Sequence, residues 1–127
     1  MNKHSFSIKA RLASFTNAWR GLTRFVRQEH NAWIHCGMTI VVVLAGFLFK
    51  LSNVEWLAVV FAIGLVLAGE AINSAIERLS DAVQPEWDDR IRDVKDISAG
   101  AVLICAITAA IIGIIVFLPK LIMLFSK

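Results

Sequence analysis

The feature that most constrains this chain is the run from Ile97 to Leu118, which contains no charged residue. It is about 22 residues long, and about 20 apolar residues in a helix are enough to cross the hydrocarbon core of a bilayer. Two further uncharged apolar runs, Ile34 to Phe49 and Trp56 to Gly69, precede it. With 57% hydrophobic residues and a mean hydropathy of +0.68, the chain is too apolar for an ordinary soluble domain. The sequence therefore predicts an all-α membrane protein with three transmembrane helices.

We expect a single integral-membrane domain over residues 1–127, with transmembrane helices at about 30–50, 54–83 and 95–118. The first apolar run alone, about 16 residues, would reach only about 24 Å, so flanking residues must extend its helix. The second helix continues past Gly69 into polar sequence and is expected to begin in lipid and end in water. Gln84 to Arg92 is expected to form a loop, and Pro119 to mark the end of the third helix.

The segment before the first span has a different pattern. Its apolar residues recur at spacings of three and four, with basic residues on the opposite arc, which predicts an amphipathic helix at about 7–28. The apolar residues of this pattern are Leu12, Phe15, Trp19, Leu22 and Val26. Such a helix suits the headgroup plane of a membrane, although a helix packed on a partner protein would show the same pattern. No uninterrupted apolar stretch occurs in this segment, so we expect no cleavable signal peptide.

Lysine and arginine are distributed unevenly along the chain. Six precede the first span and four lie between Arg78 and Lys95, whereas three lie at the opposite ends of the spans. This bias predicts a cytoplasmic N-terminus, a cytoplasmic polar end of the second helix and an external C-terminus. The basic residues suit an anionic membrane face, and we expect no nucleic-acid partner. Cys36 and Cys105 have no metal-ligand spacing and are expected to be unpaired.

A polar stripe follows the second apolar run. Glu70, Asn73, Glu77 and Asp81 are separated by three, four and four residues, which places them on one face of a helix. If that helix enters the membrane at Val54, Glu70 lies about 24 Å and Glu77 about 34 Å along it, against a hydrocarbon thickness of about 30 Å. A carboxylate at the edge of the lipid is costly, so the stripe indicates a functional site.

Acidic residues near the C-terminal end of a helix interact unfavourably with its dipole, so Glu77 and Asp81 require a nearby cation. Glu29, at the same interface, could add a carboxylate, and Mg²⁺ is typically held by one or two carboxylates together with substrate phosphates. Lys95, expected in the first turn of the third helix, would present its charge and the helix dipole to an anion. This combination suggests phosphoryl transfer to a lipid hydroxyl.

Simpler explanations remain open for these residues. Glu77 and Asp81 could form a solvated helix end, Asn73 could bridge helices, and Asp96 could be a helix N-cap. A proton or ion pathway would need acids throughout the bilayer, and the apolar runs contain none. The rival function is a noncatalytic membrane protein whose acidic cluster binds a cation or a partner.

Two motifs carry a resemblance to a known family. The pattern ExxNSAIExxxD at Glu70 to Asp81, followed by KDISAGAVL at Lys95 to Leu103, resembles the prokaryotic diacylglycerol kinase family, which includes diacylglycerol kinases and undecaprenol kinases. WRGL from Trp19 and QE ending at Glu29 extend the match over nearly the whole chain. The resemblance implies a homotrimer in the bacterial inner (cytoplasmic) membrane, with cytoplasmic active sites shared between protomers, ATP and Mg²⁺ as cofactors, and a membrane lipid as substrate.

The resemblance also implies residue roles. Glu70 would accept the proton of the lipid hydroxyl, and Glu29 and Glu77 would hold the metal. The residues implied at the nucleotide and its metal are Lys95, Asp96, Asn73, Glu29 and Glu77.

The chain departs from the diacylglycerol branch at two places. That branch has an arginine near the start of its surface helix, where this chain has Ala10, and a glutamate where it has His35. The string QEHNAWIH is more similar to the undecaprenol kinase branch. His35 could select the lipid or simply form a hydrogen bond between helices. We expect a polyprenol acceptor, with diacylglycerol as the alternative or a second substrate.

Overall fold

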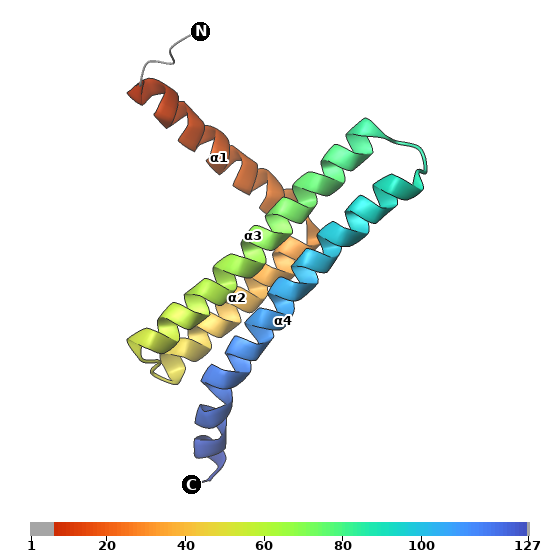
Figure 1. The fold of residues 1–127 in the computed structure, drawn as a ribbon. Helices are drawn as coiled ribbons and strands as arrows, with labels where there is room; N and C mark the ends of the chain where they lie inside the picture. The colour runs from red at the N-terminus through yellow and green to blue at the C-terminus, as the bar shows by residue number, and fades with distance from the viewer. Residues whose placement is uncertain (1–6, 127) are drawn as a thin grey trace.

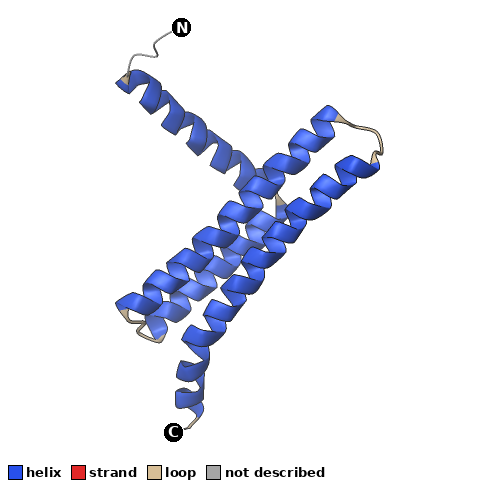
Figure 2. Ribbon diagram, viewed as in Figure 1, coloured by secondary structure: helices blue, strands red, loops and turns tan. Residues whose placement is uncertain are grey.

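The computed structural model describes residues 7–126, and these form helices joined by short connections, without a strand (Figure 2). The helices are α1 (Ile8–Gln28), α2 (His30–Leu48), α3 (Asn53–Val83) and α4 (Asp89–Phe125). Of these, α2, α3 and α4 are long and apolar enough to cross a membrane. The prediction of an all-helical protein with three candidate spans is confirmed.

The central helix of the described chain is α3, which contacts each of the other three helices. Its longest contact is with α4, and the two lie side by side, whereas the backbones of α2 and α4 do not come into contact (Figure 1). Helix α1 leaves the bundle at a steep angle. The C-terminal part of α3 and the N-terminal part of α4 extend beyond the junction of α1 and α2. Arg78 on the extension of α3 contacts Glu29 at the α1–α2 junction.

The turn between α2 and α3 closes the opposite end of the bundle. Lys50 adopts a left-handed conformation with a φ of 51°, and the side chain of Ser52 caps α3 in a reciprocal capping box with Glu55. A Cβ on Gly46 would lie 2.6 Å from the Trp56 ring, so this close approach requires glycine. Lys120 of α4 forms an ion pair of 2.9 Å with Glu55. Local capping and one ion pair thus fix how the three spans meet.

Few side chains are buried within the single chain. The apolar core consists of Leu51, Val59 and Val116 with partly buried neighbours, near the α2–α3 turn. Large apolar side chains on the outer faces are exposed; Phe47, for example, is 69% exposed and Ile115 is 67% exposed. A water-soluble domain would bury such residues, whereas lipid or neighbouring helices can cover them in a membrane.

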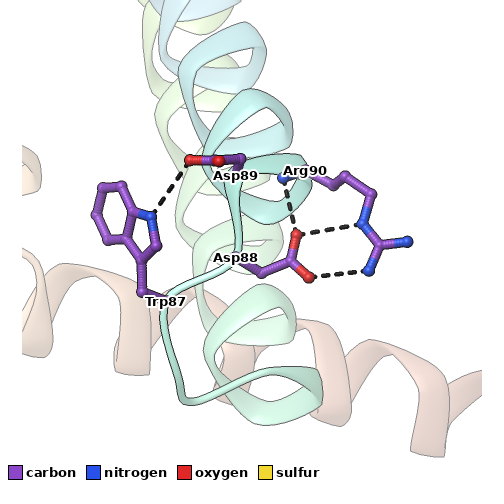
Figure 3. Close-up of polar contacts among 4 residues, drawn as sticks. All are labelled: Trp87, Asp88, Asp89 and Arg90. Carbon is purple, nitrogen blue, oxygen red and sulfur yellow. Dashed lines mark hydrogen bonds and ion pairs between the residues drawn. The ribbon is translucent and has the colours of Figure 1, made fainter.

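The helix that contains the third expected span begins earlier than the sequence predicts. Helix α4 begins at Asp89 rather than near residue 95, because Asp88 caps it by accepting a hydrogen bond of 2.8 Å from the backbone N–H of Arg90 (Figure 3). The connection is therefore residues 84–88, and Lys95 lies in the second turn of α4 instead of the first. Lys95 therefore does not lie at the N-terminus of α4, where the helix dipole would act on a bound anion.

The far end of the third span is also corrected. Pro119 lies inside α4, which continues to Phe125. Proline removes one backbone hydrogen bond and typically kinks a helix. The last turns of α4 bend away from the bundle accordingly (Figure 1).

Candidate active site

A buried carboxylate lies at the contact between α2 and α3. Glu70 is 5% exposed, and its Oε1 is 3.0 Å from Nε2 of His35 on α2. A buried carboxyl group needs a hydrogen-bond partner, and the imidazole supplies one. The packing of α2 against α3 thus turns a lone acid of the polar stripe into an acid–imidazole pair.

The next turn of α3 carries a second polar pair. The Asn73 amide nitrogen donates a hydrogen bond of 2.9 Å to Glu77 Oε1. The amide oxygen of Asn73 is buried and is the one such side-chain atom in residues 7–126 that lacks a hydrogen-bond partner. Because a buried acceptor without a partner is costly, a donor or a cation is expected at this position.

Glu29 is tied to α3 by an arginine. It is the single residue between α1 and α2, and its Oε1 accepts hydrogen bonds of 2.6 and 3.2 Å from the guanidinium of Arg78. Arg78 follows Glu77 directly on α3, so the α1–α2 junction is fastened beside the polar stripe. The guanidinium supplies a positive charge at a carboxylate that the sequence assigned to a metal.

Lys95 and Asp96 have different partners. Lys95 Nζ forms an ion pair of 2.7 Å with Asp81 Oδ1, which connects α4 to the last turns of α3. Asp96 is largely exposed and lies 3.6 Å from Arg92 on its own helix. The structure therefore brings Lys95 to the polar stripe, whereas Asp96 faces its neighbour on α4.

The donor atoms at this end of α3 are suited to a hard cation. Within residues 7–126 there is no cluster of three or more His, Cys, Asp or Glu side chains placed to hold a metal. Glu29 and Glu77, the expected metal ligands, are each bonded to another residue, Arg78 and Asn73 respectively. Carboxylate oxygens and the unpartnered amide oxygen are nevertheless the kinds of ligand that Mg²⁺ prefers. These residues therefore supply the types of ligand atom that a Mg²⁺ site needs.

An apolar groove of about 360 Å³ opens beside the acid–imidazole pair, lined by α2, α3 and α4. His35 and Thr39 are its only polar lining side chains among 15 lining residues, and Glu70 is not one of them. Its apolar lining includes Met38, Val66, Ala110 and Phe117. The polar part of the lining therefore lies on α2 and consists of the His35 imidazole and the Thr39 hydroxyl, which donates to the backbone oxygen of His35.

Sequence reasoning missed two of these partners. Arg78 was counted only as a basic residue for topology, and the contact of His35 with Glu70 was not foreseen. The available signal for Arg78 was its position next to Glu77 on the polar stripe. For His35 it was the spacing from Glu29, about one and a half turns along the first span.

The fold and the site together define an integral-membrane helical protein with a carboxylate-rich polar site at one end of its spans. Comparison with known proteins identifies the family. Residues 16–117 match the family described as prokaryotic diacylglycerol kinase. The chain is 37% identical over 108 residues to undecaprenol kinase of Bacillus subtilis, covering 85% of this chain and 88% of that protein. It is 32% identical over 114 residues to a diacylglycerol kinase of Synechocystis, covering 89% of this chain and 65% of that protein.

The chain thus belongs to the prokaryotic diacylglycerol kinase family and is a lipid kinase. The resemblance of its two motifs to this family is confirmed.

Proposed function

We propose that this protein transfers the γ-phosphate of ATP, in the presence of Mg²⁺, to the hydroxyl group of a membrane lipid. The observation that carries the proposal is the buried Glu70 carboxyl group, which is 3.0 Å from the half-buried His35 imidazole that lines an apolar groove. The next two turns of α3 hold Asn73 and Glu77. Acid–base groups beside an apolar groove, followed by oxygen ligands for a cation, suit a reaction between a lipid hydroxyl and a nucleotide.

Each polar residue has a proposed part in this reaction. Glu70 accepts the proton of the lipid hydroxyl. Glu29 and Glu77 hold Mg²⁺, and Asn73, which donates a hydrogen bond to Glu77, has an amide oxygen without a partner. When bound, the ion neutralises charge on the nucleotide phosphates. Lys95 and Asp96 contact the nucleotide.

We favour undecaprenol as the acceptor, giving undecaprenyl phosphate. The relative named undecaprenol kinase is matched over 88% of its length, and the groove offers apolar side chains except at His35 and Thr39. Diacylglycerol, which would give phosphatidic acid, is the second candidate because the other relative and the family carry that name.

We further propose a homotrimer in which neighbouring chains complete each active site. The unpartnered oxygen of Asn73 and the separate partners of Glu29 and Glu77 are consistent with a site that one chain does not complete. Chemical crosslinking in mild detergent should yield dimers and trimers, and recovery of monomers alone would contradict the assembly.

Helix α1 would lie on the cytoplasmic membrane surface, with exposed Phe15 and Trp19 facing lipid.

The proposed orientation in the inner membrane places the N-terminus in the cytoplasm and the C-terminus outside, because most basic residues would then be cytoplasmic. Single cysteines at Ser52 and Ser126, in a chain with Cys36 and Cys105 replaced, should both react with an impermeant thiol reagent in intact cells. If neither reacts, the orientation is reversed.

The decisive test of function uses purified protein in mixed micelles with labelled ATP and both lipids. We expect labelled lipid phosphate that disappears when EDTA removes the metal, and none from the Glu70→Gln variant. If the folded wild-type protein labels neither lipid, the noncatalytic alternative, an acidic cluster that binds a cation or a partner, is favoured.

A further inference from the structure

The last turns of α3 carry an arginine to which the proposed function gives no part. We infer that Arg78 exchanges partners: without nucleotide its guanidinium pairs with Glu29, and with nucleotide bound it contacts the phosphate groups. This inference rests on the proposed function and adds a phosphate-binding residue, on α3, to the same site.

The first observation is the form of the existing contact. Nη2 and Nε of Arg78 donate hydrogen bonds of 2.6 and 3.2 Å, and both end on Oε1 of Glu29. The two groups therefore do not form the fork of two parallel bonds that makes pairs of arginine and carboxylate strongest. Their side chains are 42% and 27% exposed, so water screens the attraction between them. Arg78 can consequently leave Glu29 at a small cost in free energy.

The second observation is that one carboxyl group serves two cations. Glu29 is the partner of Arg78 in the structure, and in the proposed reaction it is a ligand of Mg²⁺. A metal ion and a guanidinium on the same carboxylate would lie close together, where like charges repel. Binding of the metal with its nucleotide at Glu29 therefore favours release of the guanidinium.

The third observation is where a released guanidinium would be. Arg78 directly follows Glu77 and precedes Asp81 by one turn, so these side chains share the last turns of α3. Lys95 of α4 reaches Asp81 at 2.7 Å. Phosphate groups bound through a metal at Glu77 would thus have a guanidinium on the side of the α1–α2 junction and an ammonium on the side of α4. Arginine and lysine side chains placed in this way stabilise the charge of phosphate groups during phosphoryl transfer.

A purely structural role for Arg78 gives a different expectation. If the arginine only fastened the α1–α2 junction to α3, its removal would weaken the binding of metal and of nucleotide together. Partner exchange predicts effects of opposite sign, because removal of the guanidinium frees a carboxylate for the metal and deletes a contact to the phosphates. Binding of the metal alone and of the nucleotide with metal must therefore be measured separately.

The experiment measures nucleotide binding to the full chain in detergent micelles containing Mg²⁺. We expect Arg78→Gln to weaken ATP binding by about 10- to 100-fold, the usual loss when a hydrogen bond to a charged group is removed. Binding of tripolyphosphate, which carries phosphates without a base, should weaken by the same factor. Arg78→Lys should keep part of the affinity, because a positive charge remains at the position.

Two controls accompany these variants. Arg90→Gln removes the same charge from a guanidinium that pairs with Asp88 at the start of α4, and it should bind ATP as the wild-type protein does. Mn²⁺ without nucleotide should bind to Arg78→Gln at least as tightly as to the wild-type protein. That result also shows that the variant is folded.

Two outcomes would overturn the inference while the lipid kinase stands. One is an ATP affinity of Arg78→Gln within about threefold of the wild-type value, in a protein that labels lipid. The other is a parallel weakening of Mn²⁺ and ATP binding, which assigns Arg78 the structural role. Absence of both ATP binding and labelled lipid in the wild-type protein would instead refute the proposed function.

A second measurement uses the wild-type protein itself. In the ¹H–¹⁵N spectrum of protein labelled at arginine, the Nε–H signal of Arg78 is the one that Arg78→Lys lacks. We expect this signal to shift when tripolyphosphate and Mg²⁺ are added, while the signal of Arg90 stays in place. An Arg78 signal that does not move at saturating tripolyphosphate would show that the guanidinium keeps its partner, and the inference would be wrong.

Discussion

Nε2 of His35 and Oε1 of Glu70 lie 3.0 Å apart, although the residues are 35 positions apart in the chain. One side chain comes from α2 and the other from α3, so the contact exists only when the first two candidate spans are packed together. It joins the carboxylate that the polar stripe predicts to the histidine at which the resemblance implies a departure from the diacylglycerol branch. The proposed acid–base chemistry and the proposed choice of lipid therefore involve neighbouring side chains.

Replacement of Glu70 and of Glu77 should impair the enzyme in different ways. Glu70 is bonded to an imidazole at the groove, whereas Glu77 is bonded to an amide further along α3. We expect Glu70→Gln to abolish turnover with nucleotide affinity largely kept, and Glu77→Gln to raise the Mg²⁺ and ATP concentrations needed for half-maximal rate. Titration with a fluorescent ATP analogue and steady-state kinetics measure both. Equal binding defects in the two variants would argue against separate roles.

Arg78 should compete with a metal ion for Glu29. Its guanidinium occupies the carboxylate in the present structure, and both side chains are partly exposed. We expect Arg78→Gln to tighten Mn²⁺ binding by about two- to fivefold, in line with the small free energy of such pairs. Electron paramagnetic resonance of free Mn²⁺ measures this without turnover. Arg90→Gln, which removes the same charge at the start of α4, is the matched control. Weaker Mn²⁺ binding in Arg78→Gln would mean that Arg78 instead holds Glu29 in place.

The lipid preference should depend on His35. An imidazole in the lining of the groove adds no negative charge near a bulky apolar chain, whereas a glutamate can accept a hydrogen bond from a second polar group of the headgroup. We expect the wild-type protein to prefer undecaprenol over diacylglycerol at equal mole fraction in one micelle. His35→Glu should shift that ratio towards diacylglycerol. A several-fold preference for diacylglycerol that His35→Glu leaves unchanged would contradict the prediction.

The start of α4 should be sensitive to acid. Hydrogen bonds from the Arg90 side chain and then from its backbone N–H lower the pKa of Asp88 from 3.8 to about 2 (Figure 3). The pKa of Asp88 is lowered in the folded chain, so its ionised form stabilises the fold. This contribution to the free energy of folding is complete at pH values above the ordinary pKa of 3.8 and is lost as the pH falls from about 4 towards 2.

The chemical shift of the Arg90 amide proton, followed by NMR in detergent micelles, should therefore titrate with a midpoint near 2. In the Arg90→Gln variant the midpoint of the residue-90 amide should move up towards 3.8, because the largest cause of the shift is removed. A midpoint that is already near 3.8 in the wild-type protein would show that the cap is not formed in solution.

The sequence by itself determined the three candidate spans, the N-terminal helix and the family. Each of these depends on local information: uncharged runs such as Ile97 to Leu118 have the length of a bilayer, and the motif from Glu70 to Asp81 is contiguous. The one-face placement of the polar stripe follows from helical periodicity alone. None of these conclusions requires knowing which helices are neighbours.

The tertiary structure alone decided the partners. Glu70 pairs with His35 and Lys95 with Asp81, each across two helices, and Glu29 at the α1–α2 junction pairs with Arg78 of α3. Periodicity fixes the face of a helix on which a side chain lies, but the partner depends on how the helices pack and on their relative register. Capping by Asp88 likewise shifted the start of α4 and moved Lys95 out of its first turn. A side-chain cap depends on the backbone geometry of its turn, which hydropathy does not encode.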